Sequence, residues 1–280
     1  MIEDLKEKAK ELLTSKKVDV VIGYEAGTYK DYASPSFAKT AKDVDRFVWN
    51  KNCVNNLAIY ITKAKGKVGI IAKGCDVKSI IGIIQENQIN REDVVIIGIA
   101  CDGVEIDGEK ADKCNFCDVH TPKIYDILIG DKIESKESSQ DKYKEVAEIE
   151  NKSPEERWKY WKDTLSKCIR CYACRQVCPL CYCDKCFVDT TVPQWIPMSV
   201  NEDNNMMFHM IRAYHMASRC IGCGECQRAC PMNIPLNILS KKMTKEVEEM
   251  FGYTPGVDIE AKPAIQDFNK KEDPDKEFIM

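Results

Sequence analysis

The sequence of 280 residues lacks the marks of several protein classes. No apolar run approaches the roughly 18 residues that a membrane-spanning helix requires. The first 17 residues are charged throughout and contain no apolar stretch of the kind found in an export signal. Lysine and arginine, with 41 residues, nearly balance the 45 aspartates and glutamates, which argues against binding to nucleic acid through phosphate contacts. We therefore expect a cytoplasmic protein without a membrane span or a nucleic-acid partner.

The chain also lacks the motifs of common catalytic sites. It contains no P-loop, serine triad, paired-carboxylate site or H-E-x-x-H motif. Of its three histidines, His209 and His215 lie in a segment that predicts a helix, where we interpret them as packing or surface residues. We therefore assign no catalytic residue and favour a non-catalytic role.

Cysteine is the residue in excess, with 16 in the chain. A reducing cytoplasm does not maintain so many cysteines as disulfides. A secreted, disulfide-rich protein would require an export signal, and none is expected here. The cysteines are therefore predicted to be metal ligands, and their spacing has to identify the metal.

The first 131 residues predict an α/β domain with a small parallel or mixed sheet. An amphipathic helix is expected at the start. Four apolar runs then have the composition of strands: residues 18–22, 67–72, 94–100 and 125–130. Residues 77–88 carry apolar side chains at helical spacing, with Asp76 as the expected N-cap. The strands on either side of this helix should be parallel neighbours.

The rest of the chain divides by composition into three parts. Residues 132–157 are polar and predict a linker, residues 158–250 form a cysteine-rich domain, and residues 251–280 form a polar tail. A capping box at Ser153-Pro-Glu-Glu156 predicts a helix that ends near Ser166. The tail is either a solvated segment or, like the linker, a docking element for a partner.

The cysteine-rich domain contains one motif twice. The spacing C-x2-C-x2-C-x3-C-P occurs at residues 168–179 and again at residues 220–231. It resembles the motif of bacterial ferredoxins, which hold 4Fe-4S clusters on cysteine thiolates. Zinc, the alternative metal, also binds C-x2-C pairs but requires no such repeat. The motifs therefore predict an α+β two-cluster ferredoxin-like domain, with an insertion between them.

In two-cluster ferredoxins, the fourth cysteine of each motif ligates the cluster of the other motif. The resemblance therefore implies two ligand sets: Cys168, Cys171, Cys174 and Cys230, and Cys220, Cys223, Cys226 and Cys178. Shared ligation places the two clusters close together, as an electron relay requires. Nearby arginines such as Arg170 either tune the cluster potential or solvate the surface, and the second interpretation is favoured for most of them.

Four further cysteines are expected at one edge of the predicted sheet. Cys75 follows the second strand and a glycine turn, and Cys101 directly follows the third strand. Parallel neighbours place both residues at the same carboxyl edge, and two more cysteines lie in the next loop. We predict a third 4Fe-4S cluster, with plain buried thiols as the alternative. Its ligands would be Cys75, Cys101, Cys114 and Cys117.

Three segments around these cysteines share a wider pattern, namely KVGIIAKGCD at 67–76, IGIACD at 97–102 and CNFCDVHTPKIYDILIGD at 114–131. They resemble the core of the coenzyme F-420-reducing hydrogenase and formate dehydrogenase beta-subunit family, over roughly residues 18–131. The resemblance implies that the iron–sulfur core carries over residue by residue. It departs at the turn Ala-Lys-Gly before Cys75, where the family has Gly-Thr-Pro. The glycine-rich segment that holds flavin in the family is not evident before Val18, so FAD has no supporting motif.

Four cysteines remain outside these three sets: Cys53, Cys181, Cys183 and Cys186. The last three lie at the start of the insertion, directly after the first ferredoxin motif. With a remote fourth cysteine they would hold either a fourth 4Fe-4S cluster or a zinc ion. The third alternative is that the four are free or structural thiols.

The pattern favours an iron–sulfur electron-transfer subunit of a larger redox complex in an anaerobic setting. Thiolate-ligated clusters exchange single electrons, and a chain of three or four can relay them. The resemblance implies partner subunits such as a flavoprotein, a hydrogenase, a formate dehydrogenase or a heterodisulfide reductase-like protein. The alternatives are a flavin-containing oxidoreductase subunit that acts on a soluble cofactor such as coenzyme F-420, and a protein stabilised by structural zinc.

Overall fold

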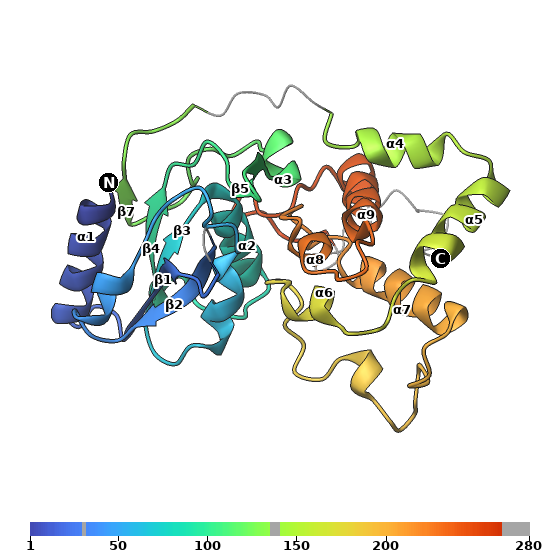
Figure 1. Cartoon of the computed structure of the whole chain (residues 1–280), viewed down its shortest axis with the longest axis horizontal. Helices are drawn as coiled ribbons and strands as arrows, with labels where there is room; N and C mark the ends of the chain where they lie inside the picture. Colours follow the sequence, from blue (N-terminus) through green and yellow to red (C-terminus); the bar gives the residue numbers. More distant parts are fainter. Residues whose placement is uncertain (30–31, 135–140, 265–280) are drawn as a thin grey trace. The chain divides into compact units, whose positions relative to one another are not determined.

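The computed structural model describes residues 1–29, 32–134 and 141–264, which divide into two compact units (Figure 1). The first unit comprises Met1–Asp141 with Gly256–Ile259. The second comprises Lys142–Pro255 and the chain from Glu260 onward. Among the described residues, no helix has the length and apolar character needed to cross a membrane.

The first unit is built on a mixed sheet of five strands in the order β2-β1-β3-β4-β7 (Figure 1). The strands are β1 (Val20–Ala26), β2 (Ala33–Ala38), β3 (Val68–Ala72), β4 (Val94–Ile99) and β7 (Ile127–Ile129). Four of them run parallel, and β2 pairs antiparallel with β1 at one edge. Every residue of β3 is buried, as expected for a central strand covered on both faces. The predicted small mixed sheet is confirmed.

Two helices cover the sheet of the first unit. α1 (Ile2–Thr14) lies on one side and α2 (Gly74–Gln85) on the other (Figure 1). The buried face of α1 packs Leu5 and Leu12 against sheet residues such as Ile71. The remaining elements are η1 (Asp43–Arg46), η2 (Leu57–Lys63), η3 (Arg91–Asp93), β5 (Glu105–Ile106), β6 (Glu109–Lys110) and α3 (Asp112–Asn115).

The start of α2 differs from the sequence prediction. Lys73 is the N-cap residue, and Asp76 lies at the third helical position, where its Oδ2 accepts the Lys73 backbone N–H at 2.8 Å. The predicted N-cap at Asp76 is therefore wrong, because that carboxylate caps the helix from within its first turn. Glycine is required at the turn, since a Cβ at Gly74 would lie 2.1 Å from the Val119 carbonyl oxygen.

The second unit consists of helices joined by cysteine-rich turns (Figure 1). Its elements are α4 (Lys144–Glu150), α5 (Pro154–Leu165), α6 (Ala173–Gln176), η4 (Phe187–Asp189), α7 (Glu202–His215), α8 (Glu225–Arg228) and α9 (Leu236–Phe251). The predicted capping box begins α5, with the Glu156 N–H donating to Ser153 Oγ at 3.2 Å and the Ser153 N–H donating to Glu156 Oε2 at 2.8 Å. The helix α7, formed by the insertion, packs against α5 and α9.

The class predicted for this unit needs a correction. Residues 142–264 contain no strand, so the expected α+β class is wrong for the part that the structure describes. Within the cysteine motifs, four residues have left-handed backbone conformations that a strand does not contain: Arg170, Tyr172, Gly222 and Gly224. The insertion between the motifs adds a helix instead of a strand.

The segments predicted as linker and tail contain structure of their own. Within the predicted linker, α4 packs against α9. In the described part of the tail, Tyr253 packs against Ala217 and Val247. Gln85 Nε2 donates to the Asp258 carbonyl oxygen at 2.8 Å within the first unit. The domain boundaries taken from composition stay a prediction, and residues 265–280 lie outside the described ranges.

Candidate metal centres

Both ferredoxin motifs follow the same backbone path. Arg170 and Tyr172 in the first motif have φ values of 51° and 59°, and the equivalent Gly222 and Gly224 have 72° and 70°. The second residue of each pair is the N-cap of a one-turn helix, α6 or α8. A left-handed conformation costs a non-glycine residue about 1–2 kcal/mol. The first motif therefore keeps this path at some expense of stability, as is common at functional sites.

This path directs backbone N–H groups at the cysteine sulfurs. The Arg170 N–H donates to Cys168 Sγ at 3.3 Å, and the Gly222 N–H donates to Cys220 Sγ in the second motif. Burial raises the pKa of the Cys220 thiol, and the Gly222 N–H opposes that effect by stabilising charge on the sulfur. Such bonds orient a thiolate ligand and tune the metal that it holds.

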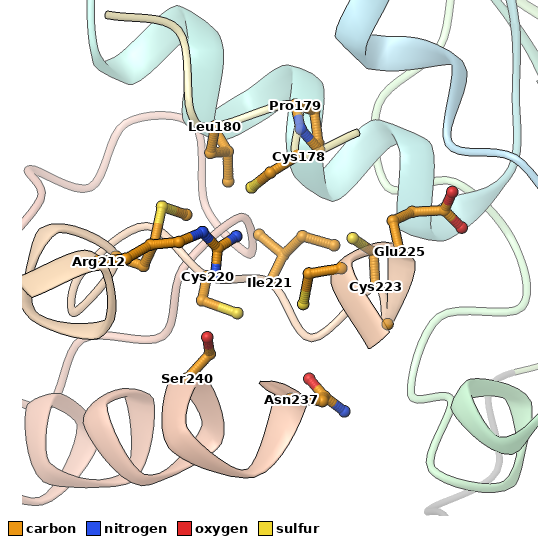
Figure 2. Close-up of a pocket in the computed structure, with 13 residues that line it drawn as sticks. Cys178, Pro179, Leu180, Arg212, Cys220, Ile221, Cys223, Glu225, Asn237 and Ser240 are labelled. Carbon is orange, nitrogen blue, oxygen red and sulfur yellow. The ribbon is translucent and has the colours of Figure 1, made fainter. Parts of the chain in front are cut away.

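The fourth cysteine of each motif lies near cysteines of the other motif. Cys178 lines one pocket with the three leading cysteines of the second motif (Figure 2). Burial, with the charges of Cys220 and Cys178, raises the pKa of Cys226 to about 12. Burial and the charge of Cys230 likewise raise the pKa of Cys168. The arrangement is the interleaved one that shared ligation requires, and the ligation itself stays a prediction.

The four cysteines predicted at the sheet edge also come together. Cys75 is the second residue of α2, just beyond β3, and Cys101 follows β4. Burial raises the pKa of Cys75 to about 12, and the charge of Cys101 adds to the increase. Burial, with the charges of Cys114 and Cys117, raises the pKa of Cys101 to about 11. Neutral thiols are therefore favoured until a metal displaces their protons.

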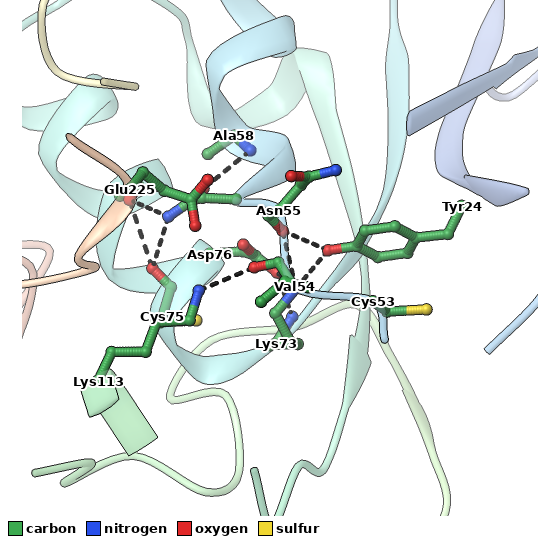
Figure 3. A network of polar contacts seen from close by, with 12 residues as sticks. Tyr24, Cys53, Val54, Asn55, Ala58, Lys73, Cys75, Asp76, Lys113 and Glu225 are labelled. Atoms are coloured by element: carbon green, nitrogen blue, oxygen red, sulfur yellow. Dashed lines mark hydrogen bonds and ion pairs between the residues drawn. The ribbon is translucent and has the colours of Figure 1, made fainter. Parts of the chain in front are cut away.

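A buried lysine lies beside this sheet-edge set. Lys73, in the turn between β3 and α2, is 1% exposed. Its Nζ lies 3.0 Å from Asp76 Oδ2, and it donates to the Asn55 carbonyl oxygen at 3.0 Å and to the Tyr24 hydroxyl oxygen (Figure 3). Burial alone lowers the Lys73 pKa, but Asp76 and the nearby cysteines raise it above its ordinary value. The side chain is therefore a fixed positive charge beside two cysteines of the sheet-edge set, Cys75 and Cys101.

The structure also identifies buried arginines that sequence reasoning missed or misjudged. Arg170 is 7% exposed, and its Nη1 donates to the carbonyl oxygens of Pro197 and Ser199 at 2.6 and 3.0 Å. Of the two roles that the sequence left open for the nearby arginines, a solvated surface role does not fit Arg170, because the insertion folds back over the first motif. Arg212 on α7 is 6% exposed, and no motif in the sequence distinguishes it. For Lys73 a signal existed, since the lysine directly follows a run of residues with the composition of a buried strand.

Unpartnered polar atoms test whether a cluster suits these sites. In the described part of the chain, four buried side-chain atoms have no hydrogen-bond partner: Asp76 Oδ1, Asn205 Oδ1, His209 Nε2 and Arg212 Nε. Arg212 lines the pocket of Cys178 and the second motif (Figure 2). A buried guanidinium N–H without an acceptor is costly. A thiolate-ligated cluster supplies negative charge and sulfur acceptors, so the residues present fit this group.

Comparisons with known proteins place these observations in a family context. Residues 164–234 match the family described as a 4Fe-4S dicluster domain (Fer4_8). The chain is similar to beta subunits of F420-dependent formate dehydrogenases. It is 25% identical over 352 residues to the subunit beta of Methanocaldococcus jannaschii and 26% identical over 360 residues to the formate dehydrogenase 1 subunit beta of Methanococcus maripaludis. Each comparison covers 91% of this chain and 91% of the relative.

These matches confirm the resemblance noted in the sequence and the prediction of an iron–sulfur electron-transfer subunit. Both alignments are longer than the 280 residues of this chain, so the formate dehydrogenase beta subunits contain segments without a counterpart here. Among solved structures, a chain of the F420-reducing [NiFe] hydrogenase complex from Methanosarcina barkeri matches 36% of this chain and 38% of its own length. The identity is 19% and the TM-score is 0.31.

The four remaining cysteines divide between the two units. Cys53 is buried in the first unit, where its Sγ accepts the Asn50 N–H at 3.4 Å and points away from Cys75 (Figure 3). The other three belong to the second unit, where burial and the neighbouring cysteines raise the pKa of Cys181 to about 12. In the described ranges no group of three or more His, Cys, Asp or Glu is arranged to hold a single metal ion.

Of the two histidines on α7, His209 is buried and His215 is exposed, and His209 gives a measurable pH dependence. His209 is 3% exposed, and burial together with Arg212 lowers its pKa to about 4. As the pH falls below about 6.5, the unfolded chain takes up a proton that the folded chain does not, so folding stability decreases. Between about pH 7 and pH 5 we expect this group to remove about 2 kcal/mol of stability. Thermal unfolding under oxygen-free conditions across this range measures the loss.

A His209→Gln variant should lack this part of the pH dependence. The matched control is His215→Gln, at an exposed position of the same helix, which should keep the wild-type slope. Equal slopes in the wild type and the His209→Gln variant would contradict the assignment.

Proposed function

We propose that this chain is an iron–sulfur subunit that relays single electrons through three 4Fe-4S clusters, two in the second unit and one in the first. The observation that carries the proposal is the interleaving of the two ferredoxin motifs, in which Cys178 lines the pocket of the second motif (Figure 2). The four cysteines that come together at the sheet edge support the third cluster. A bound cluster accepts and donates one electron without breaking substrate bonds.

The residues of this chain hold and adjust each cluster. The proposed ligands are the two ferredoxin sets and the sheet-edge set: Cys168, Cys171, Cys174 and Cys230; Cys220, Cys223, Cys226 and Cys178; Cys75, Cys101, Cys114 and Cys117. Backbone N–H groups such as that of Arg170 donate to the ligand sulfurs. Lys73 and Arg212 place buried positive charge beside the sheet-edge and ferredoxin sets, where it offsets the negative charge of thiolates.

The partners follow from the relatives. The relatives are named as beta subunits of F420-dependent formate dehydrogenases, and a beta subunit implies at least one further subunit. We propose a formate dehydrogenase subunit as the partner, with a hydrogenase, a heterodisulfide reductase-like protein or another flavoprotein as alternatives within the same class. The ferredoxin unit and the sheet-edge set are the two ends at which electrons enter and leave.

The metal content of the purified protein tests the number of clusters. Protein purified without oxygen should contain about 12 irons per chain if three clusters bind, and about 16 if Cys53, Cys181, Cys183 and Cys186 hold a fourth. A Cys183→Ser variant distinguishes these cases, since it loses about four irons only if a fourth cluster exists. Zinc measured in the same samples decides the remaining alternative for these four residues.

The cofactor content and activity of the purified protein test the function itself. Under the proposal, the protein is coloured, shows cluster signals in electron paramagnetic resonance after reduction, and does not oxidise formate by itself. Flavin released on denaturation, together with reduction of a soluble deazaflavin by the chain alone, would replace the proposal with the flavin-containing oxidoreductase. A colourless preparation with zinc and no iron would support the structural alternative instead.

A further inference from the structure

The helix α7 presents a buried polar face to the cysteine motifs. Three of the four unpartnered buried side-chain atoms in the described ranges lie on this helix, at Asn205, His209 and Arg212. These positions are spaced four and three residues apart, so they share one face. Unpartnered polar atoms are rare in native proteins, and a cluster of them calls for an explanation. Because α7 belongs to the insertion, a bare ferredoxin repeat does not account for it.

Arg212 is the member of this face that reaches both motifs. Its Nη2 donates to the carbonyl oxygen of Cys174, a residue of the first motif, at 3.1 Å. Its side chain also lines the pocket of Cys178, Cys220 and Cys226, which belongs to the second cluster set (Figure 2). A guanidinium stays protonated in proteins, so Arg212 is a permanent charge that contacts both sets.

We infer that Arg212 is a shared positioning residue of both ferredoxin clusters, which raises the reduction potential of each and lessens the repulsion between them when both are reduced. This inference rests on the proposed function. Reduction adds one negative charge to a cluster, and a cation in a buried setting favours the more negative form. Cluster potentials respond to net charge and to hydrogen bonds at the sulfurs, and the unpartnered Nε offers such a bond.

The test is a redox titration of the whole chain, followed by electron paramagnetic resonance, on the wild type and on Arg212→Gln. We expect both ferredoxin potentials to fall, with the ratio of reduced to oxidised cluster at a fixed potential changing at least tenfold, or 59 mV for one electron. Arg212→Lys keeps the charge and should retain most of the wild-type potentials. Lys167→Gln removes an exposed charge next to Cys168 and should leave both potentials unchanged, because solvent screens it.

Each outcome decides the matter. If Arg212→Gln retains its iron and either ferredoxin potential stays at the wild-type value, the inference is overturned. Should Arg212→Gln not hold iron, Arg212→Met replaces it. If neither neutral variant holds iron but Arg212→Lys does, the charge acts in cluster loading, and the inference about the potentials is overturned. Loss of iron in all three variants assigns Arg212 a packing role only. A wild-type chain without clusters would instead refute the proposed function, independently of Arg212.

Discussion

Replacing Cys178 with alanine should remove the cluster of the other motif and leave the cluster of its own motif in place. Cys178 follows the first motif in sequence, yet it lines the pocket of the second motif (Figure 2). The variant should therefore lose about four irons per chain. Its remaining spectrum should match that of Cys223→Ala, in which the second cluster is also lost, and differ from that of Cys171→Ala.

Double variants test this expectation more strictly. Once one ligand of a cluster is removed and its iron is lost, removing a second ligand of the same cluster causes no further loss of iron. The variant with both Cys178→Ala and Cys223→Ala should lose no more iron than either single variant. The variant with both Cys178→Ala and Cys171→Ala should lose about eight irons, since two clusters are then affected. Iron and sulfide analysis of oxygen-free preparations measures both. The reverse pattern would be an iron loss in the double variant Cys178→Ala and Cys171→Ala that is no larger than in either single variant. It would mean that each motif ligates its own cluster.

The sequence predicts the shared backbone path of the two motifs because the information is local. The spacing of three cysteines on one turn, followed by proline, determines a short path of backbone, and the structure repeats that path in both motifs. The left-handed residues Gly222 and Gly224 could be anticipated from glycine, whereas Arg170 and Tyr172 adopt the same conformations without such a signal. The β-α-β order was sufficient to bring Cys75 and Cys101 to one sheet edge, because parallel strands end on the same side.

The features that the sequence could not predict arise where segments far apart in the chain pack against each other and bury side chains. Arg212 lies in a helix of ordinary composition, and only its packing against the motifs makes it a buried charge. The absence of strands in residues 142–264 has the same origin, since the insertion supplies α7 where a ferredoxin-like α+β domain was expected. Lys73 could be predicted in part. The sequence shows that it follows a buried strand, but it does not show that its partner is Tyr24, 49 residues away.

Replacing Lys73 with methionine should destabilise the first unit strongly. Lys73 and Asp76 are 1% and 0% exposed, so their ion pair is shielded from water (Figure 3). Removing one partner leaves the Asp76 carboxylate buried without its cation, which costs about 3–5 kcal/mol. Methionine preserves most of the side-chain volume, so a cavity contributes little. Chemical unfolding under oxygen-free conditions, at matched iron content, measures the difference.

Two controls separate the buried charge from other effects of the Lys73→Met substitution. The double variant Lys73→Met with Asp76→Leu removes both charges and should be more stable than Lys73→Met alone, even though it loses the helix cap. Lys51→Met breaks the pair between Lys51 and Glu105, whose side chains are 63% and 31% exposed, and should cost at most about 1 kcal/mol. Equal losses in Lys51→Met and Lys73→Met would show that burial of the pair is irrelevant.

The pH dependence of the Lys73→Met effect follows from the sign of the pKa shift. Burial lowers the Lys73 pKa, but Asp76 and the adjacent cysteines outweigh it, so the folded pKa lies above the ordinary value of 10.5. A group of this kind stabilises the fold fully below its unfolded pKa and loses that stabilisation as the pH rises through the folded pKa. Between about pH 6 and pH 9 the Lys73 charge should thus persist, so the difference between wild type and variant should not shrink as the pH rises. A difference that disappears as the pH rises within that range would show that Lys73 is neutral in the folded chain, and that the sheet-edge cysteines lack the fixed charge proposed for them.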